Sequence, residues 1–126
     1  MLERGKAHTP ARSTQERDFR GLTYGKITPT DIDALIEYHD EKYVLIEAKS
    51  GNAQISFGQN LAFERLCDDL QNTKPTLLIY ARHNIPTDKP IDFAICIIDK
   101  YRYKKEWYYC YKNVKELIDI FLKAAL

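Results

Sequence analysis

Short apolar runs separated by polar breaks predict strands in the first half of the chain. Residues 33–38 and 43–49 are rich in apolar side chains, and the polar stretch 39–42 between them has the composition of a turn, so the pattern predicts a β-hairpin. Upstream, residues 22–28 are predicted to form another strand, which ends before Pro29 because proline cannot donate to a sheet ladder. The first half of the chain is therefore expected to be dominated by strands.

Helical spacing predicts three further elements. Residues 56–71 carry an inward face at steps of four, three and four residues, formed by Gln59, Phe63, Leu66 and Leu70. The C-terminal segment carries one apolar stripe, which predicts an amphipathic helix that closes the core and presents Val114, Leu117, Ile118, Phe121, Leu122 and Ala125. Ser13 and Glu16 have the spacing of a capping box, so a short helix is predicted to begin at Ser13 and to end before Gly21.

The unbroken apolar run 76–81 predicts a strand that is buried on both faces. Two more strands are predicted at 93–99 and 107–111, on either side of a basic turn near Lys104 and Lys105. The order of elements predicts an α/β fold with a mixed β-sheet flanked by helices, an αβββαβ core followed by a C-terminal strand pair and helix. The length of 126 residues suits one domain, and we expect its first dozen residues, which are polar, to be a flexible tail.

Composition excludes some classes of protein and leaves others open. The 19 lysines and arginines nearly balance the 18 aspartates and glutamates, so the overall charge does not identify a nucleic-acid-binding protein. No run approaches the roughly 18 apolar residues of a membrane helix, and the start has no apolar leader, so we expect a cytoplasmic protein without a membrane partner. Cys67, Cys96 and Cys110 lie far apart in apolar segments, which favours buried thiols over disulfides or a zinc site.

Charged side chains gather where the two strands of the predicted hairpin meet. Side chains alternate along a strand, so Glu47 and Lys49 share one face, and antiparallel pairing brings Asp33 beside Glu47. Two neighbouring carboxylates repel each other unless a cation lies between them, and hard oxygen ligands select magnesium or manganese rather than zinc. Lys49 is then expected to hold a water for attack on a phosphodiester, with the amide of Gln59 nearby.

The spacing of Asp33 from Glu47-Ala48-Lys49, at the end of an apolar strand, resembles that of the PD-(D/E)XK nuclease superfamily. The resemblance covers residues 13–81 and implies a restriction-endonuclease-like core. It also implies that Asp33 and Glu47 bind magnesium, that the carbonyl group of Ala48 completes the site, and that Lys49 acts on the nucleophilic water.

Two further residues match the family less closely. Gln59 and Phe63 match its Gln-x-x-x-Tyr pattern with phenylalanine in the aromatic place, and Glu16 matches an acidic residue on the first helix. Other interpretations stay open, because Gln59 is also suited to bond the backbone at a helix start and Glu16 is explained by the capping box alone. The Pro-Asp dipeptide of the family's name is missing, and Asp31 shares strand parity with Asp33; we favour Asp33 because an apolar run follows it.

The predicted C-terminal strand pair interleaves basic and aromatic side chains. Its basic residues are candidates for contacts to nucleic-acid phosphates, and they are Lys100, Arg102, Lys104 and Lys105. Aromatic residues are also good strand formers, and exposed tyrosines suit a subunit interface, so a homodimer contact is an equal alternative.

The sequence thus leads us to expect a metal-dependent endonuclease that hydrolyses DNA phosphodiesters. Small members of the family resemble Holliday-junction resolvases and virus-type nuclease modules of recombination and repair, which favours branched or flap DNA as substrate. The alternative is a non-catalytic nucleic-acid-binding or assembly subunit that retains the fold. The intact set of Asp33, Glu47, Lys49 and Gln59 argues against it, because two unpaired neighbouring carboxylates are costly to retain without a metal. A sequence-specific restriction enzyme is a weaker alternative, and a surface salt bridge is the simplest reading of Glu47 and Lys49 alone.

Overall fold

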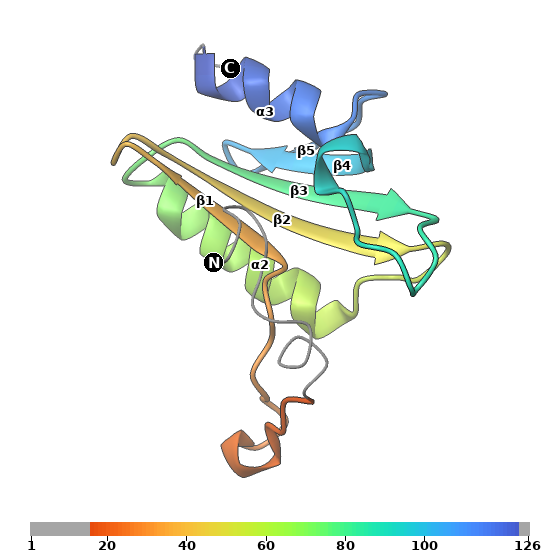
Figure 1. Ribbon diagram of the computed structural model, residues 1–126. Coiled ribbons are helices and arrows are strands. Elements are labelled where there is room, and N and C mark those ends of the chain that lie inside the picture. The colour runs from red at the N-terminus through yellow and green to blue at the C-terminus, as the bar shows by residue number, and fades with distance from the viewer. Residues whose placement is uncertain (1–15, 124–126) are drawn as a thin grey trace, which may run out of the picture. The chain divides into compact units, whose positions relative to one another are not determined.

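A computed structural model of the chain describes residues 16–123 (Figure 1). The chain divides into two units, Met1–Asp31 and Ile32–Leu126. The tail predicted for the first dozen residues lies outside the described residues. No helix in the described part of the chain has the length and apolar character needed to cross a membrane.

The first unit differs from the sequence prediction at its helix. The first residues of the predicted helix over 13–20 lie outside the described residues, and residues 16–19 are not helical. A short 3-10 helix, η1, covers Arg20–Leu22 instead. The carboxylate of Asp18 accepts hydrogen bonds from the backbone and side-chain nitrogens of Arg20, at 3.0 and 2.9 Å. Such local bonds compete with helical ones, which explains why the helix is absent from the described part of this segment.

The strand predicted at 22–28 is also wrong. Tyr24 and Ile27 form only an isolated bridge, in which each backbone nitrogen donates to the other residue's carbonyl group. Gly25 adopts a positive φ of 66° between them, so the chain reverses at once. The side chains of Tyr24 and Ile27 are 68% and 70% exposed, and no apolar face is buried that would hold a longer strand. The first helix and first strand of the expected αβββαβ core are therefore missing from the described residues.

The second unit is built on a five-stranded mixed sheet, in the order β1-β2-β3-β4-β5. Only β2 and β3 pair in parallel, and the other neighbours are antiparallel. The α/β class and the mixed sheet are confirmed. The elements, in chain order, are β1 (Ala34–Tyr38), β2 (Lys42–Ser50), α2 (Phe57–Gln71), β3 (Thr76–His83), η2 (Phe93–Ile95), β4 (Ile97–Tyr103), β5 (Glu106–Tyr108) and α3 (Val114–Lys123).

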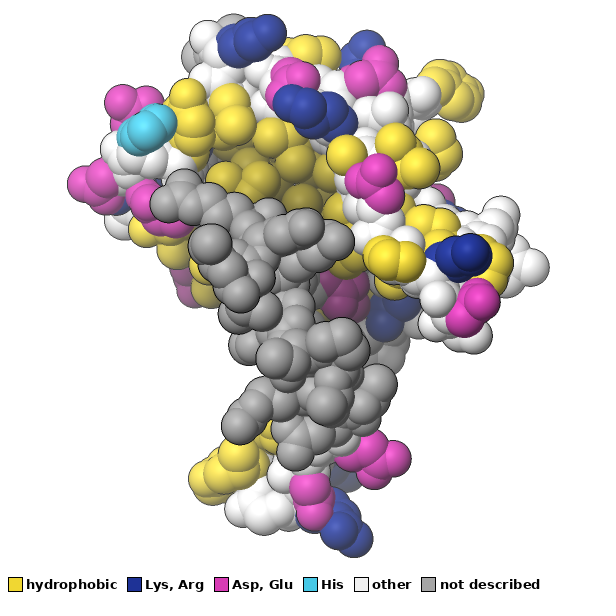
Figure 2. Space-filling model, in the orientation of Figure 1, with side chains coloured by type: hydrophobic (Ala, Val, Ile, Leu, Met, Phe, Trp, Pro, Cys, Tyr) yellow, Lys and Arg dark blue, Asp and Glu magenta, His cyan; other side chains and the backbone are white. Residues whose placement is uncertain are grey.

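The two α-helices cover opposite faces of this sheet (Figure 1). Alternate residues of β3 belong to two separate cores, with Leu77 and Ile79 packed on the α3 side and Leu78 and Tyr80 on the α2 side. The prediction that this strand is buried on both faces is confirmed. Figure 2 shows hydrophobic side chains at the surface between α3 and β1, where the sheet has an edge.

The helix α2 buries most of the predicted stripe, since Phe63 and Leu70 pack on the core and Gln59 is half-buried, but Cys67 is buried in place of Leu66. Ser56 caps the helix, since its hydroxyl oxygen accepts a hydrogen bond from the backbone nitrogen of Gln59 at 3.2 Å. Phe63 and Cys67, one turn apart, are the residues buried against the sheet. Leu66 was predicted on this face but is 38% exposed, because the stripe through Phe63 and Cys67 turns it to the flank.

Alanine substitutions on α2 test this corrected face. Phe63→Ala is expected to lower the free energy of unfolding by about 3 kcal/mol, because it leaves a cavity beneath Tyr80. Leu66→Ala, on the same helix, is expected to change that free energy by no more than about 0.5 kcal/mol. Urea denaturation of the two variants measures both values, and similar losses would contradict the orientation of the helix.

The strand β4 begins four residues later than predicted, at Ile97, and contains a bulge. Ala81 pairs with Ile98 and Tyr80 with Lys100, so Asp99 is the extra residue between them. Because of the bulge, Ile98 packs in the core on the α3 side while Lys100 lies on the α2 side with Tyr80.

The segments around β4 also differ from their predicted bounds. Residues 93–95 of the strand predicted at 93–99 form the 3-10 helix η2, and β5 begins at Glu106 and ends at Tyr108 rather than covering 107–111. The basic turn is confirmed at Lys104 and Lys105, both of which have positive φ. All three cysteines are free thiols, as predicted, and burial raises the pKa of Cys67 to about 12.

Candidate active site

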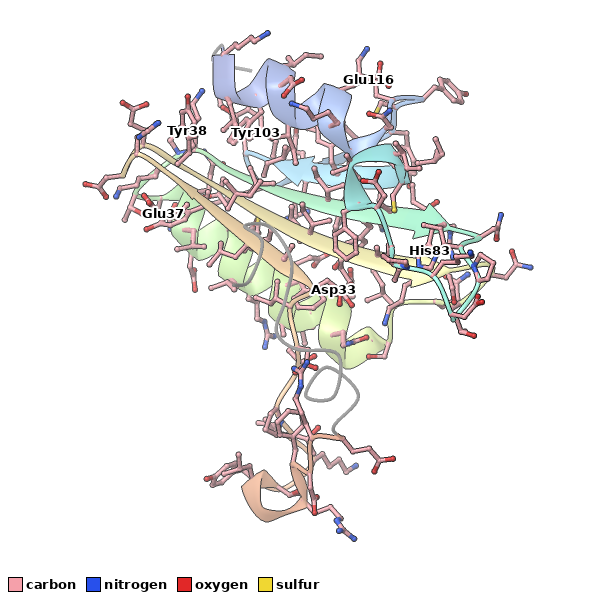
Figure 3. The ribbon with its side chains drawn as sticks, in the orientation of Figure 1. Asp33, Glu37, Tyr38, His83, Tyr103 and Glu116 are labelled. Atoms are coloured by element: carbon pink, nitrogen blue, oxygen red, sulfur yellow. The ribbon has the colours of Figure 1, made fainter. Side chains whose placement is uncertain are left out.

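Asp33 and Glu47 lie side by side at the β1 edge of the sheet, as the hairpin register predicts. Asp33 comes directly before β1, where Ala34 pairs with Ile46 (Figure 3). Its backbone nitrogen donates to Oε2 of Glu47 at 3.3 Å, and its own Oδ2 accepts from the backbone nitrogen of Ala48 at 2.8 Å. Each carboxylate thus accepts a hydrogen bond from a backbone nitrogen of the neighbouring segment, which places the two residues side by side.

Glu47 is a buried carboxylate, only 3% exposed. Burial raises its pKa, and the negative charge of Asp33 raises that pKa further. The hydrogen bond from the backbone of Asp33 and the charge of Lys49 oppose this shift without cancelling it. Ionised Glu47 is therefore an energetically unfavourable group in the protein without an added cation.

Lys49 lies between Glu47 and Gln59. Its Nζ is 3.5 Å from Oε1 of Glu47 and 3.5 Å from Oε1 of Gln59. The side chain of Gln59 is itself held by Ser56, whose hydroxyl donates to Oε1 of Gln59 at 3.4 Å. Gln59 thus contacts the site lysine, and at the helix start its side chain contacts the hydroxyl of Ser56 and not the backbone. The side chain of Lys49 is 25% exposed, so solvent can reach it.

The remaining acidic candidates belong to the first unit. Asp31, the alternative to Asp33, forms an ion pair with Arg17 at 3.0 Å. This pairing gives Asp31 a structural partner of its own and favours Asp33 as the site residue. Glu16 is exposed, and its part in the site stays a prediction.

The chemistry of the donor set suits a hard divalent cation. Asp33, Glu47 and the carbonyl group of Ala48 offer oxygen ligands, which magnesium and manganese prefer. Burial, and after it the negative charge of Asp33, raises the pKa of Glu47, and a bound cation would favour its ionised form. Within residues 16–123 there is no group of three or more histidine, cysteine or acidic side chains positioned to hold a metal, so any such site would rely on this pair and on backbone oxygen.

The four predicted phosphate contacts occupy different environments. Lys100 faces the α2 side, with Nζ 4.2 Å from the centre of the Trp107 ring. Arg102 donates two hydrogen bonds of 2.8 Å to the carboxylate of Asp68, and its side chain is 12% exposed. This ion pair joins β4 to α2 and leaves little of the Arg102 side chain accessible to a phosphate. Lys104 and Lys105 are exposed in the turn after β4.

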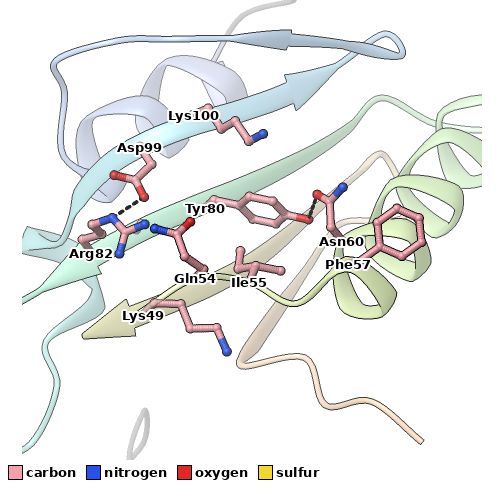
Figure 4. A pocket seen from close by; sticks show the side chains of 10 residues that line it. Lys49, Gln54, Ile55, Phe57, Asn60, Tyr80, Arg82, Asp99 and Lys100 are labelled. Atoms are coloured by element: carbon pink, nitrogen blue, oxygen red, sulfur yellow. Dashed lines mark hydrogen bonds and ion pairs between the residues drawn. The ribbon is translucent and has the colours of Figure 1, made fainter. Parts of the chain in front are cut away.

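A pocket that was not predicted from the sequence opens beside Lys49. The pocket has a volume of about 360 Å³ and is lined by Lys49, Gln54, Ile55, Phe57, Asn60, Tyr80, Ala81, Arg82, Asp99 and Lys100 (Figure 4). It could have been suspected from parity, since Glu47 pairs with Tyr80 and Lys49 with Arg82 across parallel strands, which places these side chains on one face.

Searches against protein-family models, curated proteins and solved structures found no match for this chain. The resemblance to PD-(D/E)XK nucleases therefore rests on Asp33, Glu47, Ala48, Lys49 and Gln59 and on the order of the elements that carry them.

Proposed function

We propose that the protein is a metal-dependent endonuclease of the PD-(D/E)XK type that hydrolyses DNA phosphodiesters. The observation that carries this proposal is a buried carboxylate, Glu47, with a second carboxylate, Asp33, beside it and the ammonium group of Lys49 at 3.5 Å. A stability role alone does not favour this arrangement, because a carboxylate buried beside another negative charge is costly, even though Asp33 itself is exposed. Such unfavourable groupings are typical of functional sites.

Each residue of the proposed site has a distinct role. Asp33, Glu47 and the carbonyl group of Ala48 would hold magnesium or manganese, which when bound supplies positive charge to the scissile phosphate. Lys49, held between Glu47 and Gln59, orients a water and stabilises the negative charge that grows on it.

Branched or flap DNA is the proposed substrate, in a recombination or repair role. Lys100 and the exposed turn with Lys104 and Lys105 are the proposed phosphate contacts, since positive charge on a surface attracts the nucleic-acid backbone. Tyr109 and Tyr111 are exposed after β5 and suit either substrate or a second copy of the chain.

A non-catalytic nucleic-acid-binding or assembly subunit is the second candidate, and one observation favours it. The carboxylate of Asp33 already accepts a hydrogen bond from Ala48, and Glu47 already has Lys49 and the backbone of Asp33 as partners. The expectation that the two carboxylates lack partners is thus not met. A fold that keeps these contacts without a metal is compatible with binding alone.

Cleavage assays on a labelled DNA panel separate the two candidates. The panel contains linear duplex, single strand, flap and four-way junction, each incubated with magnesium, with manganese and with chelator. We expect cleavage with either metal, none with chelator, and faster cleavage of flap and junction than of linear duplex. If the protein binds these DNAs but cuts none of them with either metal, the nuclease proposal is wrong and the second candidate replaces it.

A further inference from the structure

The pocket beside Lys49 has a floor formed by a tyrosine. Its floor is Tyr80, which is buried and donates a hydrogen bond from its hydroxyl to Oδ1 of Asn60 at 2.9 Å (Figure 4). Burial raises the pKa of Tyr80, so the hydroxyl stays protonated and the floor stays neutral. The volume of about 360 Å³ falls in the range of ordinary small-molecule pockets, roughly 300–1,000 Å³.

The wall of the pocket is predominantly positive. Lys49, Arg82 and Lys100 line it, against one acidic residue, Asp99. Arg82 is fully engaged, because it pairs with Asp99 at 2.6 Å and donates to the carbonyl groups of Gly51 and Ala53 at 2.9 and 2.7 Å. These contacts make Arg82 a fixed part of the wall. Since Lys49 is paired with Glu47, Lys100 is the pocket cation available to an anionic ligand.

An exposed aromatic side chain stands at the rim of this pocket. Phe57, the first residue of α2, lines the pocket and is 82% exposed. A side chain of this size contributes little to the core in that position, since most of its surface stays in water. A flat apolar ring beside a cationic wall suits the face of a nucleobase whose phosphate lies next to lysine.

We propose that this pocket receives an unpaired nucleobase next to the scissile phosphate, with Phe57 as the stacking platform and Lys100 at the adjoining phosphate. The inference rests on the proposed function and narrows its substrate class to nucleic acid that presents an unpaired nucleotide at the cleavage point, such as a flap or a single strand. A paired base in an intact duplex cannot enter the pocket, because it would first have to unpair and leave the helical stack.

A binding assay with short single-stranded DNA tests the pocket. Fluorescence anisotropy measures the binding, and chelator is present to keep the strand intact. Strands that carry one abasic site, scanned along the sequence, are compared with the complete strand. Removing the base at one position is expected to weaken binding to the wild type about tenfold, as is Phe57→Ala on the complete strand. The two changes together are expected to cost no more than either one alone, because both remove the same stacking contact.

Leu66→Ala is the matched control, since Leu66 is an exposed apolar residue of the same helix that does not line the pocket. Leu66→Ala is expected to leave binding of single-stranded DNA unchanged. Phe57→Trp, which keeps an aromatic ring at the rim, is expected to bind as the wild type does. Unchanged binding by Phe57→Ala, independent additive losses, or no binding of single strands at all would each overturn the inference.

The binding test and the cleavage panel can refute the two proposals independently of each other. If the protein cleaves DNA with metal, but the binding losses from Phe57→Ala and from every abasic site are additive, the pocket assignment is overturned and the nuclease proposal stands. Coupling without cleavage by either metal would keep the pocket as a nucleobase site and refute the nuclease proposal.

Discussion

Replacing Lys49 with alanine is expected to slow metal-dependent DNA cleavage by about 10²–10⁴-fold, the usual contribution of a group that acts on the attacking nucleophile. The structure gives the reason, since Nζ of Lys49 is the cationic group within 3.5 Å of Glu47. Single-turnover cleavage of the preferred panel DNA, with enzyme in excess, measures the effect on the chemical step without interference from product release.

A matched lysine distinguishes this role from a general loss of positive charge. Lys115 lies on α3, is 64% exposed and pairs with Asp119 one turn away. Lys115→Ala removes the same charge and should cleave DNA at the wild-type rate. A cleavage rate for Lys49→Ala that stays within a few-fold of this control would contradict the assignment of Lys49 to the reaction.

Glu47→Gln is expected to abolish cleavage and, at neutral pH without metal, to raise the stability of the protein. The loss of activity should equal or exceed that of Lys49→Ala, because the substitution removes a proposed metal ligand. The gain in stability follows from the raised pKa of Glu47, since its charged form is disfavoured in the folded state and the glutamine amide carries no charge.

The pH dependence of this stability difference has a definite sign. Above the raised pKa of folded Glu47, the wild type bears the full cost of the buried charge, and the glutamine variant should unfold at a higher temperature. The difference should shrink as the pH falls through that raised pKa. Below the ordinary pKa of a free glutamate, both states of the wild type bind the proton and the advantage should be gone. Thermal unfolding in chelator, across this pH range, measures the trend.

Adding magnesium or manganese should reverse the order of the two proteins. A cation held by Asp33 and Glu47 stabilises the folded wild type in proportion to its occupancy, while the glutamine variant lacks one of the charged ligands. The unfolding temperature of the wild type should therefore rise with metal concentration and that of Glu47→Gln should rise much less. Equal shifts for both proteins would place the metal elsewhere, and a destabilised variant in chelator at neutral pH would contradict the pKa argument.

The elements that the sequence predicted well are those with strong apolar patterning. The hairpin of β1 and β2, the buried strand β3 and both helices of the second unit occur within a few residues of their expected positions. The segment 22–28 failed because a positive φ at Gly25 reverses the chain, and pattern alone does not distinguish such a turn from a strand. In α2, the small thiol of Cys67 took the inward place given to Leu66, since packing space decides between neighbouring positions.

The candidate site was predictable to the extent that strand parity and register fix it. The alternation of β2 places Glu47 and Lys49 together, and antiparallel pairing places Asp33 beside Glu47. The pairing of Arg102 with Asp68 was not predictable, because it joins β4 to a helix far away in the sequence. Strand parity places Lys49 and Arg82 on one face, but the pocket behind Lys49 was missed because it forms only when β2, β3, β4 and the start of α2 come together.

Because Asp99 is the extra residue of a bulge, β4 can lose it by deletion without turning its other side chains to the opposite face of the sheet. In strict alternation Ile98 and Lys100 would share a face, yet Ile98 is in the core and Lys100 faces the opposite side. Loss of the extra residue would return β4 to regular pairing with both halves on their present faces, whereas a one-residue deletion in an unbulged strand such as β2 would exchange its faces. Among relatives of this chain, insertions and deletions within the sheet should therefore concentrate at this position, next to the pocket and not in the strand that carries Glu47 and Lys49.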